Sequence, residues 1–540
     1  MNRFKADSRY AGRRDWMPRN FTWVQALLAL VAGAAHAASL AWPGTGEPVW
    51  WLQGLALTVL AGLLERSRRQ DQDTHSPPNW RLAALWGWLF STAWLAGAFG
   101  WTYVALHTYG GLPAVLAVLA VLALSGLLAL LYASICGLYM VFRHGHHAFV
   151  AIIFAFLWLL AELARGSWLT GFGWGAAGYA HVEGPLAGLA PWFGVYGLCF
   201  AAAWLAMSLA QLLQAGRERS LRRTVLTGAP LLLLLALPIG LQRLAPELST
   251  SAGRLGITLL QGNIPQDEKF ETGSGVPLAL QWYGEQLLAS RSALVIAPET
   301  AIPVLPQQLP PDYWAGLQQR FATGQQAALI GSPLGNFKDG YTNSVVGLQP
   351  GQAKYWRYDK HHLVPFGEFI PPLFKWFTQM MNIPLGDFNR GALVQPPFVW
   401  QGQRVATNIC YEDLFGEELA PQFLDPAQAP TLFVNISNLA WFGDSMAMDQ
   451  HLQIARMRAL EFARPFVLAT NTGVSAIVDH RARVVNALPR NTRAVLEDEV
   501  EGRTGITPYA YWVSRLGLWP YWALALGAVG LALRRRLRKR

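Results

Sequence analysis

Three side chains in the second half of the sequence have the types and positions needed for acyl transfer. Glu299 follows the apolar run from Ser292, Lys360 precedes a Pro-Phe-Gly turn, and Cys410 ends the apolar run from Arg404. A free thiol has a pKa of about 8.5, so it needs a neighbouring base or cation before it attacks an acyl carbon. A carboxylate can be that base, and a fixed ammonium with main-chain N–H groups can stabilise the oxyanion. These three are the candidate catalytic residues of a site that needs no metal or organic cofactor.

Seen one at a time, each of the three positions also has an ordinary structural explanation. Glu299 can cap a helix or lie in a surface turn, Lys360 can belong to a basic loop, and Cys410 can be a small buried hydrophobe. Tyr411 and Glu412 come directly after the cysteine. We expect the Tyr411 N–H to contribute to the oxyanion site and both side chains to line the pocket. The histidines nearby lack metal-ligand spacing, so no metal site is expected.

Short β-rich runs separated by Gly, Pro and Asn begin near residue 254. Several runs are apolar throughout, as expected of strands covered on both faces, and helical stretches lie between them. This alternation predicts an α/β layered domain, in which the carboxyl ends of strands commonly carry the site. The predicted strands begin at Arg254, Ser292, Ala327, Asn343, Arg404, Thr431, Phe466 and Ser475, and the clearest helices begin at Val276 and Asp449.

The composition indicates a multi-span α-helical membrane bundle beside this domain. Of the 540 residues, 52% are hydrophobic and 14% are charged, and the mean hydropathy is +0.22. Soluble domains carry about 25% charged residues, and apolar runs of about 20 residues are long enough to cross a bilayer. We predict eight spans, at residues 22–42, 49–64, 82–106, 112–140, 148–164, 188–214, 224–242 and 516–533.

Lys and Arg residues gather at alternate ends of these spans. They lie in the N-terminal arm, in the second, fourth and sixth connectors and in the tail from Arg534, whereas the other connectors are nearly free of them. Because cytoplasmic loops retain positive charge, both termini are expected inside the cell. The chain then divides into a bundle at 1–245, an extracytoplasmic domain at 246–514 and a final helix with a basic tail at 515–540. Basic residues at helix ends do not predict a nucleic-acid partner.

Seven strings in the predicted domain resemble the nitrilase superfamily, and with the flanking spans the chain is similar to the apolipoprotein N-acyltransferase family. The resemblance covers nearly the full length. It implies an α-β-β-α sandwich and a Glu, Lys, Cys triad in that chain order, which Glu299, Lys360 and Cys410 match. The strings are QGNIPQDEKF from Gln261, PETAIP from Pro298, YDKHHLVPFGEFIP from Tyr358, NICYEDLF from Asn408, NISNLAWFGDS from Asn435, QHLQIARMRALEFARP from Gln450 and TNTGVSAIVD from Thr470.

The resemblance also implies substrates and a cellular location. The acyl donor would be a membrane phospholipid, typically phosphatidylethanolamine, and the acceptor would be the N-terminal amine of a diacylglyceryl-cysteine apolipoprotein. Such an enzyme is expected in the bacterial inner membrane as a monomer, with cytoplasmic termini and a periplasmic catalytic domain. Glu368 matches a family carboxylate and is expected to orient Lys360 by ion pairing.

Substrate contacts are expected from apolar and amide side chains around the triad. The segment 369–386 concentrates Phe, Trp, Leu and Met, which favours a lid that admits acyl chains, with packing against the bundle as the alternative. The aromatic and Gly-rich connector at 168–179 is a candidate for the opposite wall. For Asn343, satisfying the backbone at a strand end is an equal alternative. The candidate substrate-binding residues are Phe270, Asn343, Trp376 and Phe377.

The sequence departs from the family pattern at three positions. Ala463 and Ala482 stand where glycine is common, and Phe270 stands where many members have Trp, so loops and lipid contacts change while the triad does not. Two other functions stay open: a membrane-anchored nitrilase-type amidase, and a transporter with a non-catalytic receptor domain. Transport is disfavoured because Glu162 is the only acidic residue well inside a predicted span.

Overall fold

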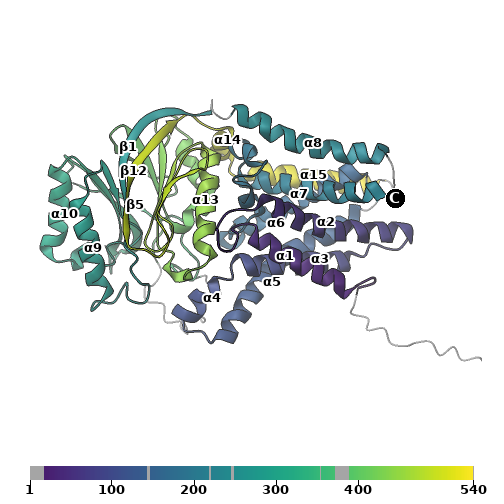
Figure 1. Cartoon of the computed structure of the whole chain (residues 1–540), viewed down its shortest axis with the longest axis horizontal. Helices are drawn as coiled ribbons and strands as arrows, with labels where there is room; N and C mark the ends of the chain where they lie inside the picture. Colours follow the sequence, from purple (N-terminus) through teal and green to yellow (C-terminus); the bar gives the residue numbers. More distant parts are fainter. Residues whose placement is uncertain are drawn as a thin grey trace, which may run out of the picture.

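The computed structural model places a helical bundle and a two-sheet α/β domain end to end (Figure 1). It describes residues 18–142, 146–217, 221–244, 248–352, 354–370 and 388–538. The bundle comes before and after the domain in the sequence, because α15 (Trp519–Leu537) returns from the domain to pack on α6 (His147–Ser167).

Helices occupy all eight of the predicted spans. In α2 the helix runs past residue 64, where the predicted span ends, to Asp73, and this extension is polar. The helices are α1 (Trp23–Ala38), α2 (Trp50–Asp73), α3 (Trp80–Ala98), α5 (Ala114–Tyr139), α6 (His147–Ser167), α7 (Ala190–Arg217), α8 (Leu221–Leu244) and α15 (Trp519–Leu537).

Length and composition alone support fewer membrane crossings than eight. Two bent pairs, α3 with α4 (Thr102–Val104) and η1 (Ala105–Tyr109), and α14 (Pro508–Leu516) with α15, each qualify if the pair is one span. They would raise the number from three to five, and the count of eight stays a prediction. Within the described residues, the three stretches long and apolar enough to cross a membrane are Ala114–Phe142, His147–Thr170 and Ala187–Ala215.

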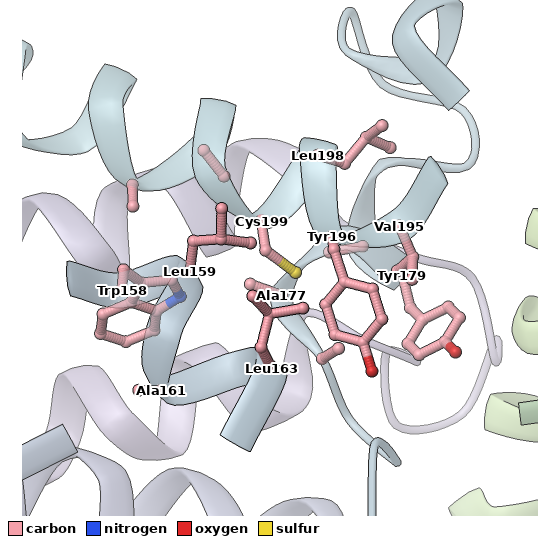
Figure 2. Close-up of a cluster of buried hydrophobic side chains, with 14 of the residues drawn as sticks. Trp158, Leu159, Ala161, Leu163, Ala177, Tyr179, Val195, Tyr196, Leu198 and Cys199 are labelled. Atoms are coloured by element: carbon pink, nitrogen blue, oxygen red, sulfur yellow. The ribbon is translucent and has the colours of Figure 1, made fainter. Parts of the chain in front are cut away.

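Aromatic side chains fill the interior of the bundle. Trp86, Trp94 and Trp158 are fully buried, and the rings of Trp94 and Trp158 stack with their centroids 5.9 Å apart. Figure 2 shows the neighbouring cluster, in which Tyr196 and Cys199 of α7 lie beside α6. Aromatic packing between α3, α6 and α7 therefore holds the centre of the bundle together.

One buried ion pair interrupts this apolar interior near the domain. The side chains of Glu162 and Arg165 in α6 approach to 2.7 Å, and both are inaccessible to solvent. Arg165 also donates hydrogen bonds to the main-chain oxygens of Phe172 and Trp174. The ion pair is therefore bonded to the connector that follows α6 and fixes its main chain.

Two six-stranded sheets form the domain. The strand orders are β12-β1-β2-β3-β4-β5 and β11-β10-β9-β8-β7-β6. In each sheet three neighbouring strands are parallel, β1-β2-β3 and β7-β8-β9, so their carboxyl ends lie at one edge. The strands are β1 (Thr250–Gln261), β2 (Leu294–Ile296), β3 (Ala327–Asn336), β4 (Gly340–Leu348), β5 (Trp356–Asp359), β6 (Phe398–Trp400), β7 (Gln403–Ile409), β8 (Leu432–Ser437), β9 (Phe466–Thr470), β10 (Ala476–Val478), β11 (Val484–Ala487) and β12 (Ala494–Thr504).

Alternate side chains of the strands face two different cores. In β1, Leu259 packs between the sheets, while Leu260 packs under α9 (Gly275–Ala289) and α10 (Pro311–Thr323). On the other side, α13 (Met446–Phe462) lies between the second sheet and the bundle (Figure 1). The predicted α-β-β-α sandwich is confirmed, and one apolar core continues from the second sheet through α13 into the bundle.

The predicted elements of the domain are present. All eight predicted strands form, and the predicted helices at Val276 and Asp449 are α9 and α13. The strands β5, β6, β11 and β12 and the helix α10 were not predicted.

Candidate active site

Glu299 lies three residues beyond the end of β2, with its carboxylate inside the domain. Its Oε1 accepts hydrogen bonds from Asn343 Nδ2 at 2.6 Å and from Lys360 Nζ at 3.4 Å. Its Oε2 accepts from the main-chain N–H of Asn438 at 2.9 Å. Both oxygens are therefore fixed by elements that are far apart in the sequence.

Lys360 directly follows β5 and is 1% exposed. Its Nζ lies 3.0 Å from the Glu368 carboxylate and 3.4 Å from Glu299 Oε1. Burial lowers the pKa of Lys360, but the neighbouring carboxylates, Glu368 and then Glu299, outweigh burial and raise it above the ordinary value. The side chain is therefore a permanent cation, and Glu368 forms the ion pair with Lys360 that the sequence predicted.

Asn343 in β4 joins the two carboxylates that flank this ammonium. Its Nδ2 donates to Glu299 Oε1 at 2.6 Å and to Glu368 Oε1 at 2.7 Å. The other Glu368 oxygen accepts from the main-chain N–H of Val364 at 2.8 Å. The Asn343 side chain thus bonds to side chains of the site and not to strand-end backbone, while its predicted contact with substrate stays a prediction.

Cys410 lies at the point where β7 gives way to η9 (Cys410–Leu414). Its φ is +51°, in the left-handed region that costs a residue with a Cβ about 1–2 kcal/mol. The main-chain oxygen of Cys410 accepts a hydrogen bond from Asn435 Nδ2 at 2.9 Å, and Asn435 also donates to Asn408 Oδ1 at 2.6 Å. The strained turn that presents the thiol is therefore held from the adjacent strand, β8.

The thiol of Cys410 lies within the electrostatic field of Glu299 and Lys360. Burial raises the pKa of this thiol well above its ordinary value, the Glu299 carboxylate raises it further, and the Lys360 ammonium lowers it. The neutral thiol is therefore the resting form, and a base must remove its proton before it can act as a nucleophile. Glu299 and Lys360 are in contact and both act electrostatically on Cys410, so the structure brings together three side chains that follow the ends of β2, β5 and β7.

The two residues after the cysteine are structural anchors in this geometry. Glu412 accepts from the main-chain N–H groups of Ile409, His361 and His362, at 2.6 to 3.0 Å, and from the Tyr358 hydroxyl at 2.9 Å. Its carboxylate therefore ties η9 to the segment around Lys360.

Tyr411 joins the site to the bundle. Its hydroxyl donates to the main-chain oxygen of Gly171 at 3.0 Å, and its ring stacks on Phe172 with the centroids 6.5 Å apart. Both partners belong to the connector at 168–179, the predicted second wall. This connector is the part that Arg165 fixes from within α6.

The remaining candidate residues lie partly outside the described structure. Phe270 follows β1, and Lys269 Nζ lies 6.0 Å from the centroid of its ring. Trp376 and Phe377, with the predicted lid from residue 371 onward, fall outside the described residues. Among the described residues, no three His, Cys, Asp or Glu side chains are grouped so that they could hold a metal ion.

Sequence reasoning missed two buried groups beside the three candidate catalytic residues. Lys269 Nζ donates to the main-chain oxygen of Glu299 at 3.0 Å, and the only signal was its place next to Phe270 in the first matching string. His451 Nε2 lies 3.0 Å from Asp413 Oδ2 behind the nucleophile turn. Burial lowers the pKa of His451, but Asp413 outweighs burial and raises it above the ordinary value.

Comparison with known proteins accounts for both parts of the chain. Residues 20–208 match the apolipoprotein N-acyltransferase N-terminal domain, and residues 257–509 match the carbon-nitrogen hydrolase family. The apolipoprotein N-acyltransferase of Verminephrobacter eiseniae is 55% identical over 503 residues, which cover 91% of this chain and 92% of that protein. The protein of the same name from Ralstonia nicotianae is 42% identical over 495 residues, with 91% and 90% covered.

Solved structures also align with part of the chain. A carbon-nitrogen hydrolase of Helicobacter pylori aligns over 50% of this chain and 94% of its own, with a TM-score of 0.31 and 16% identity. The two relatives from Verminephrobacter eiseniae and Ralstonia nicotianae each cover 91% of the chain, so the match includes both the bundle and the sandwich. The chain therefore belongs to the apolipoprotein N-acyltransferase family.

Proposed function

We propose that this chain transfers an acyl chain from a membrane phospholipid to the N-terminal amine of a diacylglyceryl-cysteine apolipoprotein, the last step of bacterial lipoprotein maturation. The observation that carries the proposal is the convergence of Glu299, Lys360 and Cys410 in a domain that shares its apolar core with a helical bundle. Because both substrates are lipids, a site next to the bundle receives them by diffusion in the membrane plane.

The first half-reaction forms an acyl-enzyme. Glu299 accepts the proton of the Cys410 thiol, and the thiolate attacks the sn-1 ester carbonyl of the donor, for which we propose phosphatidylethanolamine. Lys360 and main-chain N–H groups next to Cys410 stabilise the oxyanion, each well-placed donor contributing about 3 kcal/mol. When the ester C–O bond breaks, the lysophospholipid oxygen takes the proton from Glu299, and the acyl chain stays on Cys410 as a thioester.

The second half-reaction moves the acyl chain to the acceptor. The amine of the apolipoprotein attacks the thioester carbonyl while Glu299 accepts an amine proton. The C–S bond breaks, and the proton passes from Glu299 to the departing Cys410 sulfur. A thioester is exchanged for an amide, so no ATP is needed, and the shared covalent intermediate predicts ping-pong kinetics.

The contacts around the triad support separate tasks for the two carboxylates. Glu368 lies 3.0 Å from Lys360 Nζ and is held by Val364 and Asn343, so it can neutralise the ammonium while Glu299 exchanges protons. We propose Glu368 as a positioning residue on this basis. Phe270, Trp376 and Phe377 are proposed as acyl-chain contacts, and the connector at 168–179 as the second wall of the pocket.

The proposal includes a location and an oligomeric state. We propose a monomer in the bacterial inner membrane, with both termini in the cytoplasm and the sandwich in the periplasm. The carboxyl end of α15 lies at the end of the bundle away from the sandwich (Figure 1), and that end carries Arg534, Arg535 and Arg536. Positive charge at the far end supports a cytoplasmic tail opposite the domain.

Mass spectrometry of the purified full chain, incubated with phosphatidylethanolamine in detergent micelles, tests the proposed function. We expect an acyl-sized mass increase on the Cys410 peptide that a diacylated lipopeptide removes and water removes slowly. The increase is expected to be absent from Cys410→Ala and present in Cys136→Ala, a matched loss of a thiol within α5.

Each alternative function predicts a different result in the same experiment. Rapid release of free fatty acid, with no transfer to the lipopeptide, would identify a hydrolase. A wild-type protein that forms no adduct, together with a Cys410→Ala variant that keeps all cellular function, would contradict acyl transfer and favour transport.

A further inference from the structure

A second lysine lies beside the triad, and the acyl-transfer steps do not use it. Lys269 belongs to the turn after β1 and is 1% exposed. Its Nζ donates a hydrogen bond of 3.0 Å to the main-chain oxygen of Glu299. Burying an amine is costly unless it is bonded or paired, so this placement calls for a compensating role.

The main-chain turn that Lys269 contacts is strained. Thr300 has φ of +50°, an unusual conformation for a β-branched residue. The Glu299 oxygen accepts from Thr300 Oγ1 at 2.8 Å in addition to Lys269 Nζ. The turn also packs closely against β3, because a Cβ on Gly331 would lie 2.2 Å from the main-chain oxygen of Pro298. Two donors on the main-chain oxygen of Glu299 thus hold this turn in place without contacting the carboxylate.

The amine of Lys269 also lies within electrostatic reach of Glu299 and Cys410. Burial lowers the pKa of Lys269 to about 7, although the Glu299 carboxylate and the Cys410 sulfur each raise it. Lys360, the other cation near Cys410, is bonded to Glu299 and Glu368 and keeps its charge. Of the two lysines, Lys269 is therefore the one whose charge changes near neutral pH.

We propose that Lys269 is a positioning residue of the acyl-transfer site, which holds the turn that carries Glu299 and supplies a second amine within electrostatic reach of Cys410. The inference rests on the proposed function for its link to acyl transfer, but not for its effect on the Cys410 thiol. When Lys269 is charged, it favours the Cys410 thiolate. When it is neutral, it keeps the hydrogen bond to the main-chain oxygen of Glu299 but no longer attracts the thiolate.

Alkylation of Cys410 tests this effect without any lipid substrate. The full chain in detergent micelles is treated with iodoacetamide at several pH values from about 5.5 to 8.5, and the Cys410 peptide is quantified by mass spectrometry. The logarithm of the wild-type rate should rise with a slope below one around neutral pH, because Lys269 loses its charge as the thiol ionises. For Lys269→Met we expect a slope of one and, at pH 6, a rate about tenfold lower, which corresponds to one unit of thiol pKa.

Two further variants separate positioning from general damage. Lys269→Arg keeps a donor and a cation that stays charged from pH 5.5 to 8.5, so it should give a slope of one. Its alkylation rate at pH 6 should stay near that of the wild type, and part of the transfer rate should return. Lys338→Met removes an exposed lysine in the turn between β3 and β4 and should match the wild type. For Lys269→Met we expect kcat of transfer to fall at least tenfold with little change in KM.

The outcomes distinguish this inference from the proposed function. Wild-type alkylation slopes in Lys269→Met would overturn the inference, even if transfer fell. Unchanged transfer in Lys269→Met would overturn it as well. If the wild type showed the shallow slope that Lys269→Met lacks but formed no acyl-enzyme, the electrostatic effect would stand and the proposed function would fail.

Discussion

The two sheets contribute two halves of the site, and these halves are held in different ways. In the base half, side chains bond mainly to one another through ion pairs and amide bridges. In the nucleophile half, side chains bond to main-chain atoms and to the bundle. The base half comprises Glu299, Asn343, Lys360 and Glu368, and the nucleophile half comprises Cys410, Tyr411, Glu412 and Asn435.

This difference predicts two kinds of failure. Contacts between charged side chains determine where protons reside, so damage to the base half should change the rate and its pH dependence at nearly constant stability. Contacts with main-chain atoms determine where the nucleophile lies, and α13 packs this half against the bundle. Damage to the nucleophile half should therefore lower stability first.

The largest effect is expected from Glu368→Gln in the base half. The change removes one of the two carboxylates next to buried Lys360, so the ammonium is drawn to Glu299 alone and weakens it as a base. A positioned general base contributes about 1000-fold to the rate, which corresponds to about 4 kcal/mol in the activation barrier. Steady-state transfer to a diacylated lipopeptide measures this loss.

The same variant checks that the effect is catalytic. Lys360 keeps Glu299 as a partner, so the midpoint of thermal unfolding in micelles should change little. Glu285→Gln, an exposed change in α9, should leave both quantities unaltered. If Glu368→Gln kept more than half of the wild-type rate, the claim that contacts in the base half control the rate would be wrong.

The next largest effect is expected from Glu412→Gln in the nucleophile half. The carboxylate accepts four hydrogen bonds, and an amide in its place turns one acceptor into a donor that faces N–H and O–H groups. Leaving buried donors unpaired should cost about 3 kcal/mol. We expect a clear fall in the thermal midpoint before any assay of transfer, and an unchanged midpoint would show that Glu412 does not anchor η9.

The base half also shows how far the sequence reached. The apolar runs before Glu299 and Cys410 predicted buried strands, and the carboxyl ends of parallel strands do meet at the site. Lys360 was matched by its string, although β5, the strand before it, has four residues and is too short for a periodic signal. Composition and strand pattern were sufficient to predict a strand where burial on both faces requires a continuous apolar run.

Contacts between segments that are distant in the sequence could not be predicted. Lys269 reaches the Glu299 oxygen from a turn thirty residues earlier, and nothing in its neighbours specifies that partner. The long strand β12 was missed because its charged residues outnumber its apolar ones at an edge of the sheet. Arg165 likewise gave no sign that it would hold the connector that meets Tyr411.

A smaller effect is expected from Tyr411→Phe, which tests the link to the bundle. The change removes the hydroxyl that donates to Gly171 but keeps the ring against Phe172. One lost hydrogen bond should lower the free energy of unfolding by about 1 kcal/mol. Tyr355→Phe, which alters an exposed tyrosine, should have no such effect. Equal thermal midpoints for the two variants would show that the hydroxyl bond to Gly171 does not stabilise the nucleophile half.

The smallest effect is expected from Ala463→Gly, which relaxes strain outside the site. Ala463 caps α13 at φ +48°, nearly the φ of Cys410. Left-handed backbone costs an alanine about 1–2 kcal/mol, while glycine loses about 0.4–1 kcal/mol through the freedom of the unfolded chain. The net gain is about 0.5 kcal/mol, seen as a small rise in the thermal midpoint with transfer unchanged.

The same substitution inside a regular helix is the control for this small effect, because there we expect the opposite change in stability. Ala315 is exposed within α10 (Pro311–Thr323), so Ala315→Gly should lower stability by about 1 kcal/mol. If Ala463→Gly also lowered the midpoint, the strain at Ala463 would be offset by contacts of its methyl group. If Ala463→Gly raised the midpoint and lowered transfer, strained backbone at the end of α13 would contribute to the activity of the nucleophile half. The effect of strain at Cys410 could then not be considered apart from the strain at Ala463.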